Sequence, residues 1–218
     1  MTLDIVALTN AQSPQAEAYR SLRTNLDFYS LENPLHTLLI ASPEPDDDKT
    51  KVVANLGVIS AQGGKRVILV DADMRRPRLH DVFGVNNHRG LATALAEEEG
   101  DLPLVDTAVP NLRILPAGPT PVNPADLLAS HRMNDVLEQL KGMADVILFD
   151  APPLVAVTDG ALLAARVDGV LLVARAGQTR RELVERARDI LGKVKANLVG
   201  AVLTNAAVET GVYKYYGE

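Results

Sequence analysis

Apolar runs of strand length recur along this 218-residue chain, and stretches with helical character separate them. The runs occupy residues 37–41, 66–70, 112–115, 145–149, 169–174 and 197–203. The helical stretches occupy residues 13–29, 50–62, 90–98, 124–141, 159–166 and 179–194. Strands that alternate with helices form βαβ units, whose parallel strands need helices on both faces. The pattern predicts an α/β fold: a doubly wound, mainly parallel sheet with helices on both faces, in one domain over residues 1–218.

Local signals indicate where several of these elements begin and end. Ser13 and Pro14 are typical of an N-cap and a first helical position, and they follow a polar lead-in at residues 1–12. The pair at 63–64, Gly-Gly, is expected to end the helix before it. The proline-rich stretch 116–124 predicts a surface loop, because proline removes backbone donors.

Composition excludes several kinds of site. The chain has no cysteine, which excludes disulfides, a thiolate zinc site and a cysteine nucleophile. Its four histidines lack H-x-x-x-H spacing, so we expect no histidine-based metal site. A net charge of −6 and the absence of tryptophan predict no nucleic-acid partner. Without a long apolar run or a signal-peptide pattern, the chain is expected to be cytoplasmic.

The segment 41–50 has the context of a phosphate-binding loop. It reads Ala-Ser-Pro-Glu-Pro-Asp-Asp-Asp-Lys-Thr and lies between a strand-like run and a helical stretch. Lys49 and Thr50 stand where the loop G-x-x-x-x-G-K-[ST] has its Lys and its Ser or Thr. Pro43 and Asp48 stand at the two glycine positions. The context therefore predicts a nucleotide site, whereas the lost glycines predict a poor one.

Three aspartates follow two of the central strands. Asp71 and Asp73 come after one apolar run, and Asp150 comes directly after another. Ligands of such sheets bind beyond the carboxyl ends of the strands. Carboxylates and a hydroxyl such as that of Thr50 suit Mg²⁺. A single aspartate could be only a helix cap, but all three after a loop of this kind predict a magnesium–nucleotide site.

Taken together, these motifs resemble those of the bacterial tyrosine kinases (BY-kinases) of the separate cytoplasmic CpsD/CapB type. That family belongs to the MinD-like branch of the P-loop NTPases, and the resemblance covers nearly the whole chain. It is carried by the helix Glu17–Arg23 (E-x-x-R-x-x-R), the loop beginning at Ser42, the Walker A′ segment Val70–Pro77, the Walker B segment Asp150–Pro153, and a tail with tyrosines.

The resemblance implies roles for individual side chains. Nucleotide binding would involve Ser42, Asp46, Asp47, Asp48, Lys49, Thr50, Lys51 and Asn205, although Thr204 could take the place of Asn205 after a shift of one residue. Magnesium would be held by Thr50, Asp71 and Asp150, and catalysis would use Asp71, Asp73 and Lys49. Lys49 would hold the β- and γ-phosphates, while Asp71 would help to deprotonate an incoming tyrosine. The implied cofactors are Mg²⁺ and ATP or ADP.

The resemblance also implies an assembly. Glu17, Arg20 and Arg23, in the helix 13–29, would join subunits into a ring, either of this chain alone or mixed with a related kinase. Their spacing by itself predicts only exposed ion pairs within one helix. In the tail 206–218, the acceptors phosphorylated in trans would be Tyr213, Tyr215 and Tyr216. A membrane polysaccharide co-polymerase would act as activator and recruit the chain to the inner face of the cell membrane.

The loop departs from the family pattern, P-G-E-G-K-[ST]-[ST], because residues 45–51 read Pro-Asp-Asp-Asp-Lys-Thr-Lys. Two unit charges about 4 Å apart interact by roughly 4 kcal/mol at an effective dielectric of about 20. Aspartates facing the phosphates would therefore weaken ATP binding strongly, whereas aspartates facing outward would not. We expect impaired or absent ATP binding.

Three interpretations follow. The first is a BY-kinase-like protein of capsule or exopolysaccharide assembly that acts as a ring-forming scaffold and phosphotyrosine acceptor. The second is an active ATP-dependent protein-tyrosine autokinase that regulates polysaccharide export, favoured by the intact Lys49, Thr50 and aspartates. The third is a MinD- or ParA-like positioning switch. It ranks last because residues 42–44 contain no lysine and 206–218 is not amphipathic.

Overall fold

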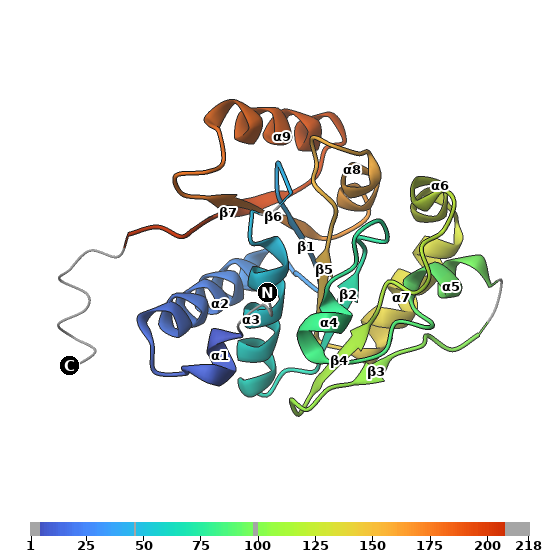
Figure 1. Cartoon of the computed structure of the whole chain (residues 1–218), viewed down its shortest axis with the longest axis horizontal. Helices are drawn as coiled ribbons and strands as arrows, with labels where there is room; N and C mark the ends of the chain where they lie inside the picture. Colours follow the sequence, from blue (N-terminus) through green and yellow to red (C-terminus); the bar gives the residue numbers. More distant parts are fainter. Residues whose placement is uncertain (1–4, 46, 98–99, 208–218) are drawn as a thin grey trace.

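A computed structural model describes residues 5–45, 47–97 and 100–207 of the chain. These residues contain a seven-stranded sheet with the strand order β3-β4-β2-β5-β1-β6-β7 (Figure 1). Only the pairing of β3 with β4 is antiparallel; all other neighbours are parallel. The strands are β1 (Thr37–Ala41), β2 (Val67–Asp71), β3 (Val105–Asp106), β4 (Leu112–Leu115), β5 (Val146–Asp150), β6 (Gly169–Arg175) and β7 (Leu198–Thr204).

Helices cover both faces of this sheet. One face packs against α1 (Val6–Thr9), α2 (Pro14–Glu32), α3 (Lys49–Gln62) and α4 (Leu79–Phe83). The other face packs against α5 (Leu91–Ala96), α6 (Pro124–Ala129), α7 (Arg132–Met143), α8 (Asp159–Ala164) and α9 (Arg181–Lys193). The predicted doubly wound α/β fold is therefore confirmed.

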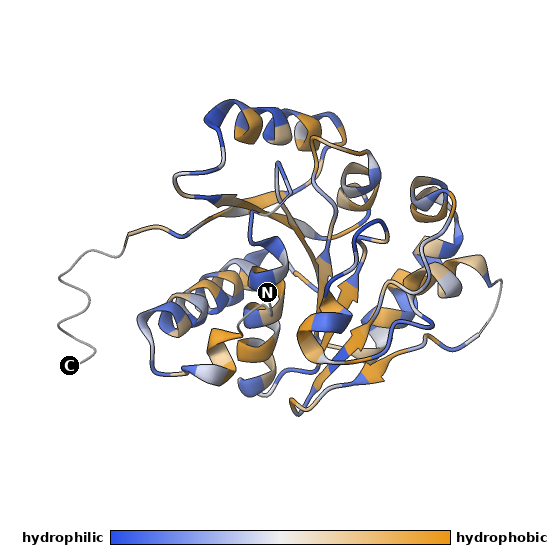
Figure 2. Cartoon of the chain, viewed as in Figure 1, coloured by the Kyte–Doolittle hydropathy of each residue, from blue (hydrophilic) through white to orange (hydrophobic). Residues whose placement is uncertain are grey.

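Alternation along the central strands produces the two cores. In β1, Leu39 and Ala41 belong to the core under α5–α9, whereas Leu38 and Ile40 belong to the core under α1–α4. Every residue of β1 and β2 is buried, as expected of strands covered on both faces. Figure 2 shows the same arrangement: apolar residues run along the strands, and polar residues lie on the outer side of α9.

Several boundaries differ from those predicted. The expected helix 124–141 is two helices, because the backbone of Ser130 is extended and its N–H and hydroxyl both bond the carbonyl of Leu127. The predicted polar lead-in contains α1, which the side chain of Asn55 holds by accepting a hydrogen bond from the Ala7 N–H at 3.0 Å. The short elements α4 and β3 were not predicted.

The end signals at α2 and α3 are confirmed. The hydroxyl of Ser13 accepts a hydrogen bond from the N–H of Ala16 at 3.2 Å, and Pro14 is the first residue of α2. Helix α2 extends three residues beyond the predicted end, to Glu32. Helix α3 ends at Gln62, before the two glycines. No helix in the described part of the chain is long and apolar enough to cross a bilayer.

Candidate nucleotide site

Lys49 and Thr50 follow the loop after β1 and are the first two residues of the buried helix α3. The first four N–H groups of a helix lack partners within it, so this turn presents donors and partial positive charge to an anion. Asp48 precedes the helix with φ = 63°, the left-handed geometry that glycine usually supplies at such a position. Aspartate tolerates this geometry at a cost of about 1 kcal/mol. At Asp48 the backbone therefore has the conformation that a glycine would give it.

Lys49 is held between two carboxylates. Its ammonium donates hydrogen bonds to Asp73 Oδ2 and Asp150 Oδ1, each at 3.1 Å, and only 8% of the residue is exposed. Burial opposes the charged lysine, but Asp150 and Asp73 outweigh it and raise the pKa of Lys49 above its ordinary value. The hydroxyl of Thr50 donates to Asp150 Oδ2 at 2.6 Å. Lys49 and Thr50 are thus bound to the aspartates predicted to work with them.

Asp71 and Asp150 end neighbouring strands at paired positions. The N–H groups of Arg78 and Leu79 donate to Asp71 Oδ2, each at 2.9 Å. Asp71 Oδ1 is buried and has no hydrogen-bond partner in the described part of the chain. Burial, together with the charge of Asp150, raises the pKa of Asp71 to about 8. The site therefore contains a carboxyl group that is prepared to receive a cation or a proton.

This arrangement fits magnesium when other ligands help. No group of three or more His, Asp or Glu side chains that could hold a metal by itself occurs among the described residues. Two carboxylates and a hydroxyl, from Asp71, Asp150 and Thr50, converge instead. Mg²⁺ commonly takes one or two carboxylates and completes its octahedron with water and phosphate oxygens. The unpartnered Asp71 Oδ1 is the observation that favours such an ion.

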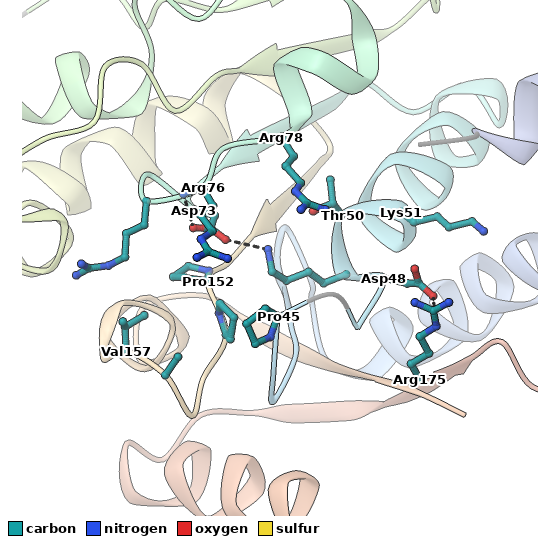
Figure 3. A pocket seen from close by; sticks show the side chains of 14 residues that line it. Pro45, Asp48, Thr50, Lys51, Asp73, Arg76, Arg78, Pro152, Val157 and Arg175 are labelled. Carbon is teal, nitrogen blue, oxygen red and sulfur yellow. Dashed lines mark hydrogen bonds and ion pairs between the residues drawn. The ribbon is translucent and has the colours of Figure 1, made fainter. Parts of the chain in front are cut away.

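The two described loop aspartates turn away from this centre. Asp47 is 1% exposed, and its carboxylate accepts hydrogen bonds from the Glu44 N–H at 3.1 Å and from the Thr179 hydroxyl. Asp48 Oδ2 accepts from the Thr204 hydroxyl at 3.1 Å and lies 3.6 Å from Arg175 Nε. Figure 3 shows Asp48 directed toward Arg175 and away from Asp73. Protein groups therefore already bind both carboxylates.

A cavity of about 530 Å³ opens over these residues. Among the described residues that line it, six side chains are cationic and two, Asp48 and Asp73, are acidic. The cations are Lys49, Lys51, Arg75, Arg76, Arg78 and Arg175. The sequence reasoning did not assign roles to these four arginines, although two of them, Arg75 and Arg76, lie in the Walker A′ segment. An anionic ligand fits this cavity by charge.

The other predicted site residues lie apart from the centre. Ser42 is fully buried, and its hydroxyl donates to the Glu44 carbonyl at 2.7 Å, so it shapes the loop. Asn205 has φ = 53°, and its amide donates to the Ala176 carbonyl at 3.5 Å, outside the lining of the cavity. Asp46 lies outside the described residues.

The residues of the predicted oligomerisation motif make contacts within their own subunit. Arg20 pairs with Glu17 at 2.7 Å on α2. Arg23 reaches α3, where its NH1 donates to the Ile59 carbonyl at 3.0 Å. Gly63 leaves room for this arginine, since a Cβ there would lie 2.5 Å from the same nitrogen. The acceptors Tyr213, Tyr215 and Tyr216 lie outside the described residues.

The sheet, the helices that cover it and the loop before α3 have the P-loop NTPase fold of the MinD-like class. A solved MinD protein from Pyrococcus horikoshii is similar in fold, with a TM-score of 0.66 at 21% identity over 83% of this chain and 76% of that one. This likeness concerns the fold alone.

Within that class, the chain belongs to the bacterial tyrosine-protein kinases. It is 35% identical over 219 residues to the tyrosine-protein kinase YwqD of Bacillus subtilis. The match covers all of this chain and 92% of the relative. The kinase domain of the Escherichia coli tyrosine kinase ETK has a TM-score of 0.90 at 31% identity over 96% of this chain and 83% of that one. The chimerical protein CapA2B2 has a TM-score of 0.87 at 28% identity, over 91% and 88%. No family model matches the chain.

Proposed function

We propose that this chain is an ATP-dependent protein-tyrosine kinase subunit of capsule or exopolysaccharide assembly, with a nucleotide affinity lowered by its acidic loop. The observation that carries the proposal is the placement of Lys49, whose ammonium lies 3.1 Å from both Asp73 and Asp150. The lysine that would bind phosphate therefore lies beside the carboxylates that would serve magnesium and proton transfer.

The roles of the side chains follow from their surroundings. Lys49 and the first-turn N–H groups of α3 would bind the β- and γ-phosphates. Thr50, Asp71 and Asp150 would hold Mg²⁺, which when bound neutralises charge on the transferred phosphoryl group. Asp71 would accept the phenol proton of an acceptor tyrosine in its ionised form, which a bound Mg²⁺ would favour against the effect of burial. Asp73 would keep Lys49 in place.

The acidic loop sets the affinity in this proposal. Asp47 does not line the cavity, and its carboxylate is bound by the Glu44 N–H and the Thr179 hydroxyl, so its charge would act on a phosphate less than that of Asp48. Asp48 lines the cavity, so its charge would act on the nucleotide even though Arg175 and Thr204 bind it. The electrostatic penalty would therefore come from Asp48 and be partly screened. Lys51, which also lines the cavity, would offset some of it.

Assembly completes the proposal. Rings of this chain, or rings mixed with a related kinase, would place the tail tyrosines of one subunit at the site of the next. A membrane polysaccharide co-polymerase would activate the ring and recruit it to the inner face of the cell membrane. The similarity to tyrosine kinases and to the chimerical protein CapA2B2 supports this part.

A second candidate is a scaffold and phosphotyrosine acceptor without catalysis of its own. The presence of Asp48 in the lining of the cavity favours it. The two candidates differ in nucleotide binding, which calorimetric titration of Mg-ADP and Mg-ATP measures directly. The titration would compare the natural protein with Asp46→Gly/Asp48→Gly and with Lys49→Met.

We expect micromolar binding by the natural protein, loss of binding in Lys49→Met, and phosphorylation of the tail tyrosines detected by mass spectrometry. Binding only in the double-glycine variant would overturn the kinase proposal and favour the scaffold. Binding without tyrosine phosphorylation, even with the activator present, would also contradict it.

A further inference from the structure

The cavity is strongly cationic although the protein as a whole is acidic. The chain has a net charge of −6, yet six cations and two acids line the cavity within the part of the chain that the structure describes. Three of the cations, Arg75, Arg76 and Arg78, come from one short segment after β2. The roles proposed above for nucleotide and magnesium use Lys49 and do not use these arginines. Their charge therefore points to a second anion beside the nucleotide.

Arg76 is the member of this segment best suited to bind such an anion. Arg75 already forms two hydrogen bonds with Asp159, at 2.8 and 3.0 Å. The side chain of Arg76 has no hydrogen-bond or ion-pair partner within residues 5–45, 47–97 and 100–207, and the residue is exposed. In Figure 3 its guanidinium lies in the cavity near Pro152. An exposed guanidinium with no carboxylate partner can form paired hydrogen bonds with a phosphate.

The backbone of Arg76 is fixed next to the transfer centre. Its N–H donates to Asp73 Oδ1 and to the Asp73 carbonyl, both at 3.1 Å. The same carboxylate receives the hydrogen bond from Lys49. Asp73 thus links the phosphate-binding lysine to the arginine. An anion on Arg76 would lie close to the group that is being phosphorylated.

The sequence of the tail indicates which anion this is. The run from Tyr213 to Tyr216 contains Lys214, and no acidic residue stands between Glu209 and Glu218. An unmodified run is therefore locally cationic and would be repelled by a cationic cavity. A phosphorylated tyrosine adds about −1.5 to −2 charges and three acceptor oxygens. One phosphate changes the run from repelled to attracted.

We propose, on the basis of the function proposed above, that Arg76 binds a phosphotyrosine already present in the acceptor tail and so promotes transfer to a neighbouring tyrosine. In each transfer, the acceptor tyrosine oxygen forms a bond to the γ-phosphorus, and the bond from that phosphorus to the β,γ-bridging oxygen breaks. The phenol proton goes to the Asp71 carboxylate, and ADP leaves. Phosphorylation of the tail is then sequential, with a slow first step.

The test measures peptide binding in the absence of nucleotide. Fluorescent peptides with the sequence of residues 206–218 would carry Tyr215, phosphotyrosine at 215, or glutamate at 215, and binding would be followed by anisotropy. We expect the phosphopeptide to bind at least about tenfold more tightly than the other two peptides. Arg76→Gln should remove this preference. Arg186→Gln, which removes the same charge from the exposed face of α9, should retain it.

Four outcomes of the peptide measurement overturn the inference. Equal affinity for all three peptides would exclude recognition of an anion, and equal affinity for the phosphate and glutamate peptides would exclude recognition of phosphotyrosine. A preference that survives in Arg76→Gln would assign the site elsewhere. Full displacement of the phosphopeptide by Mg-ADP would show that it occupies the nucleotide site. Preferential binding without any kinase activity would contradict the proposed function and leave the Arg76 site standing.

Discussion

The carboxylate of Asp48 accepts a hydrogen bond from the hydroxyl of Thr204, 3.1 Å away at the end of β7. The residue that replaces a loop glycine is therefore hydrogen-bonded to the end of an edge strand of the sheet. Its neighbour Asp47 is buried beneath the loop and bound to Thr179. The two adjacent aspartates thus have different roles: Asp47 stabilises the loop, and Asp48 adds charge to the cavity. Substitutions at Asp48 should therefore change nucleotide affinity, whereas substitutions at Asp47 should change stability.

Asp48→Asn should increase the affinity for Mg-ADP by about tenfold, equivalent to about 1.4 kcal/mol. Asparagine also tolerates left-handed geometry and can accept the hydrogen bond from Thr204, so this variant removes the charge and little else. Calorimetry measures the change. Asp48→Gly, which also relaxes the backbone, should bind at least as well as Asp48→Asn. An unchanged affinity in both variants would show that Asp48 does not act on the nucleotide.

Asp47→Ala should reduce the free energy of unfolding by about 2 kcal/mol, because it leaves the Glu44 N–H and the Thr179 hydroxyl without their acceptor. Urea unfolding measures this loss. Thr179→Val is the matched control, since it removes one of the two bonds and leaves the other. The double variant should lose less than the sum of the two single losses. Full stability in Asp47→Ala would contradict the role given to this carboxylate.

The raised pKa of Asp71 predicts a dependence of stability on pH. The pKa is about 8 in the folded protein and lies above the ordinary value of 3.8, so the folded state holds a proton that the unfolded chain has lost. The stabilisation is complete below about pH 4 and is lost as the pH rises to about 8. Between these limits this group contributes a slope of up to about −1.4 kcal/mol per pH unit.

Asp71→Asn should remove that slope, because its amide does not titrate. Urea unfolding without magnesium, repeated at intervals from about pH 5 to about pH 8, compares the two proteins. The difference between their free energies of unfolding should change steadily across this range. A constant difference would mean that Asp71 is ionised in the folded protein throughout.

Arg23→Ala should lower the free energy of unfolding by about 1 to 2 kcal/mol, because Arg23 bonds the Ile59 carbonyl near the end of α3. Arg20→Ala should change it by less than about 0.5 kcal/mol, since the pair of Arg20 with Glu17 is partly exposed and its hydrogen bond to the Ala11 carbonyl is exposed. Denaturant unfolding and sedimentation would be measured on both variants. An Arg23→Ala protein that loses assembly but keeps full stability would show that its main contact is between subunits.

Much of the fold was predictable because its signals are local and repeated. The continuous apolar runs at β2 and β5 indicated doubly buried strands, and Ser13 with Pro14 indicated the start of α2. The two-residue β3 gave no periodic signal and exists only through its pairing with β4. The break near Ser130 depends on hydrogen bonds to Leu127 that no spacing of apolar residues predicts.

The site was predictable where topology alone fixes it. Aspartates at the ends of adjacent parallel strands must meet, so the approach of Asp71 to Asp150 followed from the strand assignment. The direction of the loop side chains did not follow. It depends on Thr179 and Thr204, which are more than 130 residues away in the chain and come close only through the packing of β6, β7 and their connections. The sequence therefore shows that Asp48 replaces a glycine, but it does not show where the side chain of Asp48 points.

Helix α2 contacts both ends of the helix that begins with Lys49. Arg23 bonds the carbonyl of Ile59 near one end, and at the other end burial and the charge of Asp48 raise the pKa of Tyr19 to about 12. A ring that used Arg20 and Arg23 between subunits would have to exchange these internal bonds for external ones. Its subunits would then associate more slowly than diffusion allows. Because α2 packs on α3, this exchange would also disturb the helix that begins at the nucleotide loop, so assembly and the loop would share one structural element.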